Sequence, residues 1–594
     1  MQLADHYIRL AQKTPVGQQL PIPLEEVANI LCCTARNAKL VLKKLAEHNW
    51  VHWQPGRGRG NRSLLTLQIA PDDLLYSLAI ELVQKGDLPA ASALVESYRD
   101  DFPALPSRFQ TWLSSHFGYH VEAREGRAVD TLRITHSRPL FQLDPAHAWL
   151  RSEWHLVKHL FDTLVTYDAS TATICPHLAH DWEVSADATE YTFFLRKGVL
   201  FHNGTQLTAD DVAFTLHRLQ TDSLYAWMFA DLEEITVHSE QILHLKLRAP
   251  NHLFLHILSD PRAAVLPQEY FTEIGADFAR LPVGSGPFKI VRNDEAMLVL
   301  QAFAPYFRER PFLDRIEIWV LPDLDLPASS NEYDIRYTGG AANWNTIHQV
   351  ERSFQLLTMN LNKPGPLQHP AFREALTLLL DRRQMISDLG GARFALASRF
   401  DQSLEDTAEE IAPPDRPLIT ALLAESGYDG RTLSLITMPD EDHREDCVWM
   451  QQRCQEFGID LQFKLLDARE MIRSERIGEA DMCLDGATVI DHLELSYLDL
   501  LRTPSFFIYP HLSKQLRQLT AETISALLQI ASGEERHRRL QALESELLEQ
   551  KVILPLYRNR ITISTPRFLH GVSLNSQGWV DYRQLWFKKK DLHS

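Results

Sequence analysis

The sequence is poor in cysteine and contains no long apolar run. Its 594 residues include six cysteines, and no two of them form a Cys-x-x-Cys pair. So few cysteines do not make a disulfide framework. They fit a reducing compartment, and we expect them to be small buried hydrophobic residues. For the neighbours Cys32 and Cys33 we expect buried packing at the turn between two helices, with a thiol switch as the alternative. Because no run of about 18 apolar residues occurs, we expect no membrane-spanning segment.

Motifs of common enzymes and phosphate-binding proteins are absent as well. The sequence has no Gly-x-Gly-x-x-Gly or Gly-x-x-x-x-Gly-Lys loop, no His-Glu-x-x-His and no Gly-x-Ser-x-Gly. Gly284-Ser285-Gly286-Pro287 is interpreted as a turn, since Pro287 lacks the N–H that a phosphate cradle needs. The run Asp440-Glu441-Asp442-His443 is interpreted as an exposed acidic loop rather than a metal site. We therefore expect no enzyme activity, no cofactor and no metal.

Charge is distributed unevenly along the chain. Residues 1–70 contain nine Lys and Arg against four Asp and Glu, a net charge of +5, whereas the whole chain carries −18 and the remainder therefore −23. A basic N-terminal part on an acidic body is expected when only that part contacts nucleic acid. The opening residues MQLADHYIRLAQKTPVGQQLP lack the apolar core of a secretory signal, so we expect a cytoplasmic protein.

The N-terminal part has the pattern of three short helices followed by a hairpin. Apolar spacing predicts helices over residues 3–12, 24–32 and 35–48. Strands are predicted over residues 50–53 and 64–67, with a Gly- and Arg-rich tip between them. Thr34 is the expected N-cap of the third helix. The buried stripe of that helix is predicted to be Ala38, Val41, Leu42 and Leu45.

This arrangement is that of a winged helix, a fold that binds DNA. A helix fits the major groove, where Arg and Lys pair with guanine and Asn pairs with adenine, and basic wing residues reach phosphates or the minor groove. A solvated basic face, a flexible turn and a contact with single-stranded RNA are the alternatives. The candidate DNA-binding residues are Thr34, Arg36, Asn37, Lys39, Lys43, Lys44, Arg57, Arg59, Asn61 and Arg62.

A family resemblance covers this part of the chain. Residues 24–67 read LEEVANILCCTARNAKLVLKKLAEHNWVHWQPGRGRGNRSLLTL, with Trp50 and Trp53 before a Gly-Arg-Gly-Asn-Arg-Ser wing. This pattern resembles the SgrR-type transcriptional regulators, which respond to sugar-phosphate stress, and it implies a DNA-binding regulator. Residues 71–125 are predicted to form an amphipathic helical connector, with a dimer or relay element and plain packing onto the body as alternative roles.

From about residue 129 the pattern changes to short strands that alternate with helices. Its motifs include LFDTLVTYDAS, PHLAHDWEVSADATEYTFFLRKGVLFHNGTQLTADDVAFTLHRL, LPVGSGPFKIV and HPAFREALTLLLDRRQMI, in this order. They resemble the extracellular solute-binding proteins of family 5. The resemblance implies an α/β multidomain chain, in which a winged helix-turn-helix over 1–70 precedes a bilobal periplasmic-binding-protein type II-like domain over 126–594. Thr208 is predicted to cap a helix. A helical core stripe is predicted from Phe372, Ala375, Leu376 and Leu379.

The candidate ligand-binding residues come from this resemblance. Peptide binders of the class carry a Trp and an Asp late in the cleft, and the matching residues 482–491 lack the Trp but keep Asp485 and Asp491. Peptide binding is therefore not expected. Arg336, Trp344 and Asn360 are the other candidates, because Arg can hold a phosphate or carboxylate and Trp can stack on a sugar face. Ordinary packing or a structural salt bridge is the alternative for each.

Together these features predict a DNA-binding transcriptional regulator that senses a small solute. Its expected partners are double-stranded DNA and a small-molecule effector, such as a sugar phosphate or a related metabolite, with no membrane contact. Closure of the two lobes on the effector would reorient the DNA-binding part. A peptide or solute receptor of an ABC transporter is the main alternative, and an RNA-binding adaptor and a hydrolase are further ones. A homodimer is the candidate assembly.

Overall fold

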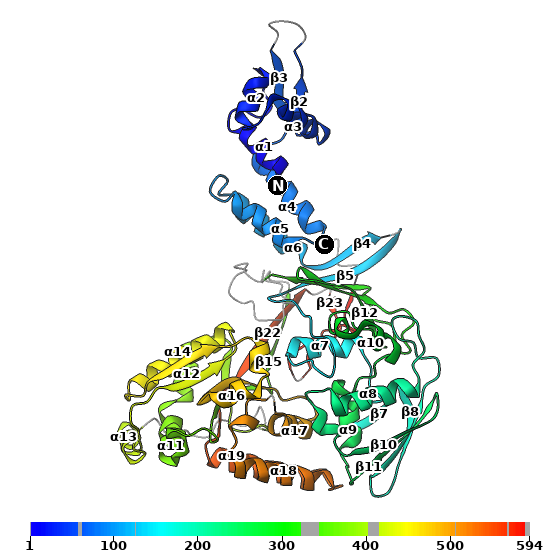
Figure 1. Cartoon of the computed structure of the whole chain (residues 1–594), viewed down its shortest axis with the longest axis vertical. Helices are drawn as coiled ribbons and strands as arrows, with labels where there is room; N and C mark the ends of the chain where they lie inside the picture. Colours follow the sequence, from blue (N-terminus) through cyan, green and yellow to red (C-terminus); the bar gives the residue numbers. More distant parts are fainter. Residues whose placement is uncertain are drawn as a thin grey trace.

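The computed structural model is an elongated molecule, in which a small N-terminal head and three helices stand on a two-lobed body (Figure 1). The bilobal α/β body behind a winged helix is the predicted fold class. Within the described part of the chain, no helix is both long and apolar enough to cross a lipid bilayer. The structure describes residues 2–56, 62–124, 126–321, 344–401, 415–504, 506–566, 569–575 and 577–588.

The head is a winged helix built on one apolar core. Its helices are α1 (Gln2–Ala11), α2 (Leu24–Ile30) and α3 (Ala35–Glu47). Its strands are β1 (Leu20–Ile22), β2 (Val51–Gln54) and β3 (Ser63–Leu67), paired antiparallel in the order β1-β3-β2. The predicted helices and hairpin are confirmed, and β1 is an addition too short to give a periodic pattern. Thr34 caps α3 as predicted, since its Oγ1 accepts a hydrogen bond of 3.3 Å from the N–H of Asn37.

The turn between α2 and α3 corrects a prediction about the cysteines. Cys32 has φ 52° and an exposed side chain, and Cys33 is only half-buried. Because the backbone leaves α2 in a left-handed conformation at Cys32, this side chain is not part of the head core. Cys175 is also half-buried. Burial is confirmed for the cysteines of the second lobe, Cys447, Cys454 and Cys483.

Three helices connect the head to the body. They are α4 (Pro71–Gln84), α5 (Leu88–Ser97) and α6 (Leu105–His116). The helical prediction up to residue 124 is wrong at its end, because Gly118 has φ 94° and begins the strand β4 (Gly118–Arg124). β4 pairs along its length with β5 (Arg127–His136), so these residues already belong to a sheet of the body.

The first lobe contains two sheets. One has the order β12-β13-β14-β5-β4, with β14 parallel to β5 and the other neighbours antiparallel. Its further strands are β12 (Phe288–Asn293), β13 (Met297–Ala302) and β14 (Arg315–Val320). The second sheet has the antiparallel order β10-β11-β9-β8. Its strands are β8 (Ala179–Val184), β9 (Glu190–Leu195), β10 (Leu232–Ser239) and β11 (Ile242–Leu247).

Helices and a small hairpin complete the first lobe. The helices are α7 (Arg151–Leu160), α8 (Ala209–Thr221), α9 (Phe254–Ser259) and α10 (Gln268–Ile274), with short 3₁₀ turns η1 (Ala226–Phe229), η2 (Pro261–Ala263) and η3 (Gly275–Ala279). The hairpin consists of β6 (Val165–Asp168) and β7 (Thr173–Pro176). Thr208 is the N-cap residue of α8, as predicted, and its N–H and Oγ1 donate to Oδ2 of Asp211 at 2.9 and 3.1 Å, as in a capping box.

The second lobe is a five-stranded sheet with helices around it. The order is β19-β18-β20-β16-β21. The strands are β16 (Phe354–Met359), β18 (Leu433–Thr437), β19 (Leu461–Leu465), β20 (Met482–Ala487) and β21 (Ile553–Pro555). The helices are α11 (Pro370–Leu379), α12 (Arg382–Leu389), α13 (Arg416–Glu425), α14 (Glu441–Gln455), α15 (Ala468–Met471), α16 (Ser474–Glu479), α17 (Leu493–Arg502), α18 (Lys514–Leu528) and α19 (Gly533–Glu549). The predicted core stripe on α11 is fully buried: Phe372, Ala375, Leu376 and Leu379.

A two-stranded ribbon joins the lobes. β15 (Trp344–Val350) pairs antiparallel with β22 (Tyr557–Pro566), which also pairs with β17 (Arg393–Leu396) of the second lobe. After β22 the chain returns to the first lobe through β23 (Leu569–His570) and β24 (Trp586–Phe587). There, apolar residues of the last segment share a core with β5, β12 and β14. The C-terminal segment therefore completes the first lobe.

Two other sequence interpretations are tested by the body. A Cβ atom at Gly284 or Gly286 would lie 2.1 or 2.5 Å from the backbone of Leu160, so this turn is a close approach of two chain segments. The interpretation of residues 440–443 as an exposed loop is wrong. Glu441 begins α14, and the buried His443 lies 2.8 Å from Nε2 of Gln355. Acidic residues at that point suit the positive end of a helix.

Candidate functional site

The helix α3 separates apolar from basic side chains. The apolar stripe predicted for it is buried, with exposures of 7% or less. The basic face is exposed, as expected for Arg36, Asn37, Lys39, Lys43 and Lys44. Lys43 makes an ion pair with Glu47 at 3.7 Å, but both side chains are well exposed. Such a surface pair contributes little, so Lys43 is available to a polyanion.

The strands β2 and β3 form a hairpin that extends from the helices of the head (Figure 1). At its base, the N–H of Gly56 donates a hydrogen bond of 3.1 Å to Oγ of Ser63. Arg62, the last of the predicted wing contacts, is exposed. The other predicted wing residues, Arg57, Arg59 and Asn61, lie outside the described residues.

Two tyrosine hydrogen bonds lie where the head meets the connector, one between α1 and the segment that leads into α4 and one between α1 and the end of α5. The hydroxyl of Tyr7 on α1 donates to the carbonyl of Ile69 at 2.5 Å and accepts from its N–H at 3.3 Å. Tyr98, after α5, hydrogen-bonds Asp5 of α1. The apolar core of the head continues through α4, α5 and α6 without a break. The head and the connector therefore share one continuous apolar core.

The connector packs on the five-stranded sheet of the first lobe. The apolar core of the head and connector includes four side chains of this sheet region. Met297 and Val299 are on β13, Trp319 is on β14, and Leu321 follows the end of β14. The ring of Trp319 meets the His116 ring of α6 edge to face, with centroids 5.3 Å apart. The structure thus supports packing of the connector onto the body.

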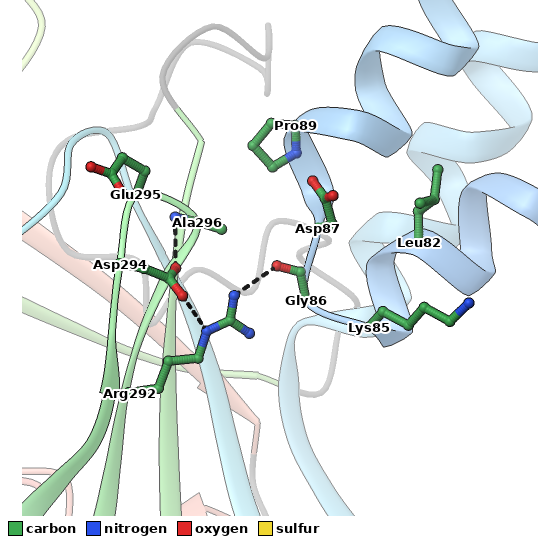
Figure 2. Close-up of a pocket in the computed structure, with 9 residues that line it drawn as sticks. All are labelled: Leu82, Lys85, Gly86, Asp87, Pro89, Arg292, Asp294, Glu295 and Ala296. Atoms are coloured by element: carbon green, nitrogen blue, oxygen red, sulfur yellow. Dashed lines mark hydrogen bonds and ion pairs between the residues drawn. The ribbon is translucent and has the colours of Figure 1, made fainter. Parts of the chain in front are cut away.

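A polar contact borders the same interface at the turn between α4 and α5 (Figure 2). The guanidinium of Arg292, on β12, donates to the carbonyl of Gly86 at 3.2 Å and to Asp294 at 2.5 Å. These residues line an open cavity of about 510 Å³. Gly86 has φ +80°, and a Cβ there would lie 2.2 Å from Nη1 of Arg292. The turn and the guanidinium fit each other closely.

The two lobes touch at a buried ion pair. Arg262, on η2 of the first lobe, donates a hydrogen bond of 2.8 Å to Oδ2 of Asp499 on α17 of the second lobe. Its guanidinium lies over the rings of Tyr225, 4.4 Å from the centroid, and Trp154, 5.5 Å. Burial disfavours its charge, yet the nearby Asp260 and Asp499 raise the Arg262 pKa above its usual value.

A second cation lies near this pair. Burial lowers the pKa of Lys158 on α7, and the carboxylates of Asp260 and Asp491 act against that shift. Asp491 belongs to the second lobe, in the loop that leads from β20 into α17. The surface between the lobes therefore combines two cations of the first lobe with two carboxylates of the second.

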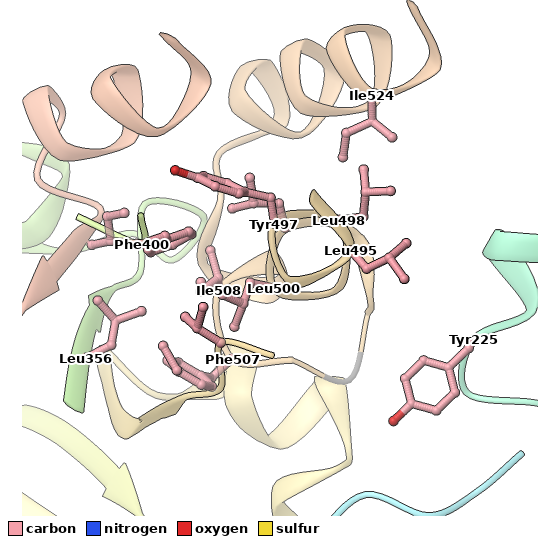
Figure 3. Close-up of a cluster of buried hydrophobic side chains, with 14 of the residues drawn as sticks. Tyr225, Leu356, Phe400, Leu495, Tyr497, Leu498, Leu500, Phe507, Ile508 and Ile524 are labelled. Carbon is pink, nitrogen blue, oxygen red and sulfur yellow. The ribbon is translucent and has the colours of Figure 1, made fainter. Parts of the chain in front are cut away.

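Further contacts surround this interlobe surface. Nε1 of Trp227 donates to Oγ1 of Thr503 at 3.1 Å across the lobes. One apolar cluster contains residues of both lobes, and Figure 3 shows Leu495 of α17 on the side of Tyr225, with Tyr497 on the other side toward Phe400. The lobes are in direct contact along α17.

The predicted ligand residues do not form one group. Asp491 lies at the interlobe surface, but Asn360 lies at the other end of the antiparallel pair β16–β20, beyond Met359. The amide of Asn360 donates to the carbonyls of Gly478 and Ala480 and accepts two backbone N–H groups, which uses its full capacity. Asn360 therefore has a structural role in place of the predicted one.

The remaining predicted residues are placed elsewhere or not described. Asp485 is on β20, where burial raises its pKa to about 6, with His443 acting against the shift. Trp344 begins β15, and its side chain lies outside the described residues, as does Arg336. Among the described residues, no group of three or more His, Cys, Asp and Glu is placed to hold a metal ion.

Apart from Asp491, the sequence did not point to the interlobe residues. Arg262 and Asp499 are 237 positions apart, and neither belongs to a recognisable motif. Trp154 and Lys158 are four residues apart on one helix, which places them on one face. That spacing is the one local signal that pointed to this surface.

Comparisons with known proteins match both parts of the chain. The profile of bacterial extracellular solute-binding proteins, family 5, matches residues 173–506, and that of the sugar transport-related sRNA regulator N-terminal domain matches residues 2–120. The uncharacterized protein YhjP of Bacillus subtilis is 35% identical over 99% of this chain and 100% of its own length. The HTH-type transcriptional regulator SgrR of Yersinia enterocolitica is 26% identical over 98% of each chain.

Solved structures of binding proteins match about three quarters of the chain. The periplasmic binding protein DppA from Helicobacter pylori, in complex with the peptide STSA, covers 77% of this chain and 98% of its own, with a TM-score of 0.65 and 18% identity. The oligopeptide-binding protein AppA from Bacillus subtilis also has a TM-score of 0.65, at 19% identity, over 77% of this chain and 99% of its own. At these identities the likeness shows the fold.

Fold and comparisons together define a winged-helix protein joined to a two-lobed solute-binding body. The chain belongs to the bacterial extracellular solute-binding proteins of family 5, and its N-terminal match and full-length relatives make it an SgrR-type regulator with a solute-binding domain. Both resemblances found in the sequence are confirmed. The matched families are regulators and solute-binding proteins rather than enzymes.

Proposed function

We propose that the protein is a transcription regulator that binds duplex DNA through α3 and the wing, and that a small solute bound between the lobes controls this binding. The observation that carries the proposal is the exposed basic face of α3, on a head whose apolar core continues into the body. The transport-receptor alternative gives α1 to α6 no role.

The DNA contact follows from the chemistry of α3. Arg36 and Asn37 lie in its first turn, where a recognition helix meets base edges, and Lys43 and Lys44 lie farther along, where they can pair with phosphates. The net charge of +5 over residues 1–70 attracts DNA, while the charge of −23 on the rest of the chain repels it. Binding is therefore confined to the head.

The effector we propose is a small anionic solute of the sugar-phosphate class. Arg262 and Lys158 present two cations at the interlobe surface, and each interacts there with a carboxylate of the second lobe. A phosphate group would replace a carboxylate as partner of one cation. Trp154 and Tyr225 offer ring faces beside Arg262, which suits a sugar. The match to a sugar transport-related regulator supports the same class.

Control of DNA binding would pass through the connector. A solute that binds one arrangement of the lobes more tightly shifts the population toward it. The first lobe holds the connector through Trp319 and Arg292, and the connector holds the head through Tyr98. A movement of the sheet β12–β14 would therefore change the orientation of α3.

Binding of duplex DNA by the full-length protein, measured by fluorescence anisotropy over a range of salt concentrations, tests the first part. Lys44→Ala should weaken binding to every duplex and reduce the slope of log K against log salt by about 1. The matched control is Lys514→Ala, an exposed lysine on α18 of the second lobe, which should leave both unchanged. Failure of the wild-type protein to bind duplex DNA at moderate salt would refute the proposal.

A thermal-shift screen of the full-length protein tests the effector. Sugar phosphates, the corresponding free sugars and short peptides are compared, since a ligand that binds the folded state raises Tm. We expect stabilisation by a sugar phosphate and its loss in Lys158→Met. Stabilisation by peptides alone would show that the proposed effector class is wrong, without affecting the DNA-binding proposal.

A further inference from the structure

A large apolar side chain is exposed in the middle of the basic face of α3. Leu40 is 55% exposed, and among the exposed large apolar residues that the structure describes only Phe312, at 64%, is more exposed. Single exposed apolar residues are common on protein surfaces and by themselves mean little. The position of Leu40 is what distinguishes it.

Helical spacing puts Leu40 at the centre of the candidate DNA-binding face. Residues three and four positions apart are neighbours on a helix, so Leu40 adjoins Arg36 and Asn37 before it and Lys43 and Lys44 after it. All four of these neighbours are exposed. Any surface that binds them also covers the side chain of Leu40.

The fold of the head does not require this leucine. The helix already buries its apolar stripe, and Leu40 is not among the residues that form or flank the head core. A polar side chain at this position would keep the helix and remove apolar surface from water. Leu40 therefore has apolar surface that a partner can cover.

Resting on the proposed function, we propose that Leu40 contacts the 5-methyl group of a thymine in the major groove and thereby selects thymine at one position of the DNA site. The thymine methyl is the apolar group that a base pair presents in that groove, beside acceptors and donors that Arg, Lys and Asn read. Leu40 would thus supply the apolar part of a contact whose polar parts come from its neighbours.

The charge around Leu40 favours DNA over a protein partner. A second copy of this chain that docked through the same face would bring Lys43, Lys44 and Arg36 against their own counterparts. Like charges at an interface are repulsive. A polyanion, in contrast, pairs with these cations while the apolar side chain meets the methyl group.

In vitro selection from a random duplex library, with full-length protein, provides the first test. The wild-type protein should enrich sites with one thymine that Leu40→Ala no longer enriches, while the other selected positions stay the same. Circular dichroism and Tm of Leu40→Ala should match the wild type, because the side chain is exposed. An unchanged thymine preference in Leu40→Ala would overturn the inference.

Replacing that thymine by deoxyuridine, which lacks only the methyl group, provides the second test. The wild-type protein should lose about 3- to 5-fold in affinity, as expected for one buried methyl. The affinity of Leu40→Ala should not fall when the same thymine is replaced by deoxyuridine. The substitution and the base exchange each remove the same methyl contact, so their effects do not add. The control, Lys44→Ala, should bind more weakly but keep the full thymine-to-deoxyuridine difference.

The outcomes separate this inference from the proposed function. If the wild-type protein binds its selected site equally well with thymine or deoxyuridine, Leu40 has no thymine contact, although DNA binding stands. If Leu40→Ala changes self-association and not sequence preference, a protein partner covers the residue. If the wild-type protein binds no duplex DNA, the proposed function and this inference both fail.

Discussion

Glu153 is a carboxylate in the first turn of α7, and burial raises its pKa to about 7, although the N–H groups of Trp149 and Leu150 act against the shift. A raised pKa means that the folded state holds the proton more tightly than the unfolded chain. The resulting stabilisation is complete below the usual glutamate pKa near 4.5. It is lost as the pH rises through 7.

Glu153→Gln should remove this pH dependence. Oε2 of Glu153 accepts both backbone hydrogen bonds, at 3.0 and 2.9 Å, and the amide oxygen of Gln can accept the same two. We expect the variant to match the wild type near pH 5 and to be more stable at pH 8, by up to about 3 kcal/mol. Urea unfolding at several pH values measures this.

The control for that experiment is Glu269→Gln, at an exposed position of α10. The unfolding free energy of this control variant should depend on pH as that of the wild type does. Equal pH dependence of the wild type and Glu153→Gln would show that Glu153 is charged in the folded protein at neutral pH.

At the residue scale, the sequence is informative where a role is local. Thr34 caps the helix that follows it directly, and the basic residues of α3 lie on one face because of helical spacing alone. The interlobe residues are different. Arg262 meets Asp499 only after both lobes have folded, and no pattern around either residue marks it. Asn360 shows the converse error. The family resemblance suggested that it binds a ligand, but its side-chain amide is fully used in hydrogen bonds with the backbone.

Elements were predicted best where periodicity runs over several turns. The helices of the head and the stripe of α11 follow this rule, with boundaries within two residues for α3. The strand β4 was missed because the end of a helix depends on one residue, Gly118, whose left-handed φ of 94° the sequence permits but does not require. Residues 440–443 were misjudged because acids suit a helix start as well as a loop.

The turn between α4 and α5 supports a prediction at the scale of elements. Gly86→Ala places a Cβ 2.2 Å from Nη1 of Arg292, so the guanidinium must move and release the carbonyl of residue 86. Hydrogen exchange of the amides in residues 84–90, followed by mass spectrometry, should become faster. A left-handed alanine also costs about 1 kcal/mol by itself.

The matched control is Gly430→Ala. Gly430 has φ +83°, close to the +80° of Gly86, but a Cβ there would meet no atom within 4 Å. Both variants should lose similar stability, and only Gly86→Ala should loosen the connector turn. Equal exchange over residues 84–90 in the two variants would show that the Arg292 contact does not hold the turn.

At the scale of the whole molecule, the contacts form a chain from the lobes to the head. The sheet of the first lobe carries the connector, and the connector shares an apolar core with the winged helix. The family resemblance predicted two lobes and a winged helix. It did not predict how closely the lobes and the connector are packed, because packing depends on side chains from distant segments.

The Arg262–Asp499 pair should hold the two lobes together. Both side chains are largely buried, at 8% and 14% exposure, and Asp260 shares the same guanidinium. Arg262→Met keeps much of the apolar volume but leaves two carboxylates without their cation, which typically costs about 3–5 kcal/mol. Because separation of the lobes would return both carboxylates to water, we expect a lower Tm and a larger radius of gyration in X-ray scattering.

The control is Arg476→Met, which removes an exposed pair with Glu479 inside the second lobe and should leave both the Tm and the radius of gyration unchanged. Asp499→Asn added to Arg262→Met removes one of the stranded charges and should restore part of the Tm. An unchanged radius of gyration in Arg262→Met would mean that the apolar contacts along α17 suffice to keep the lobes together.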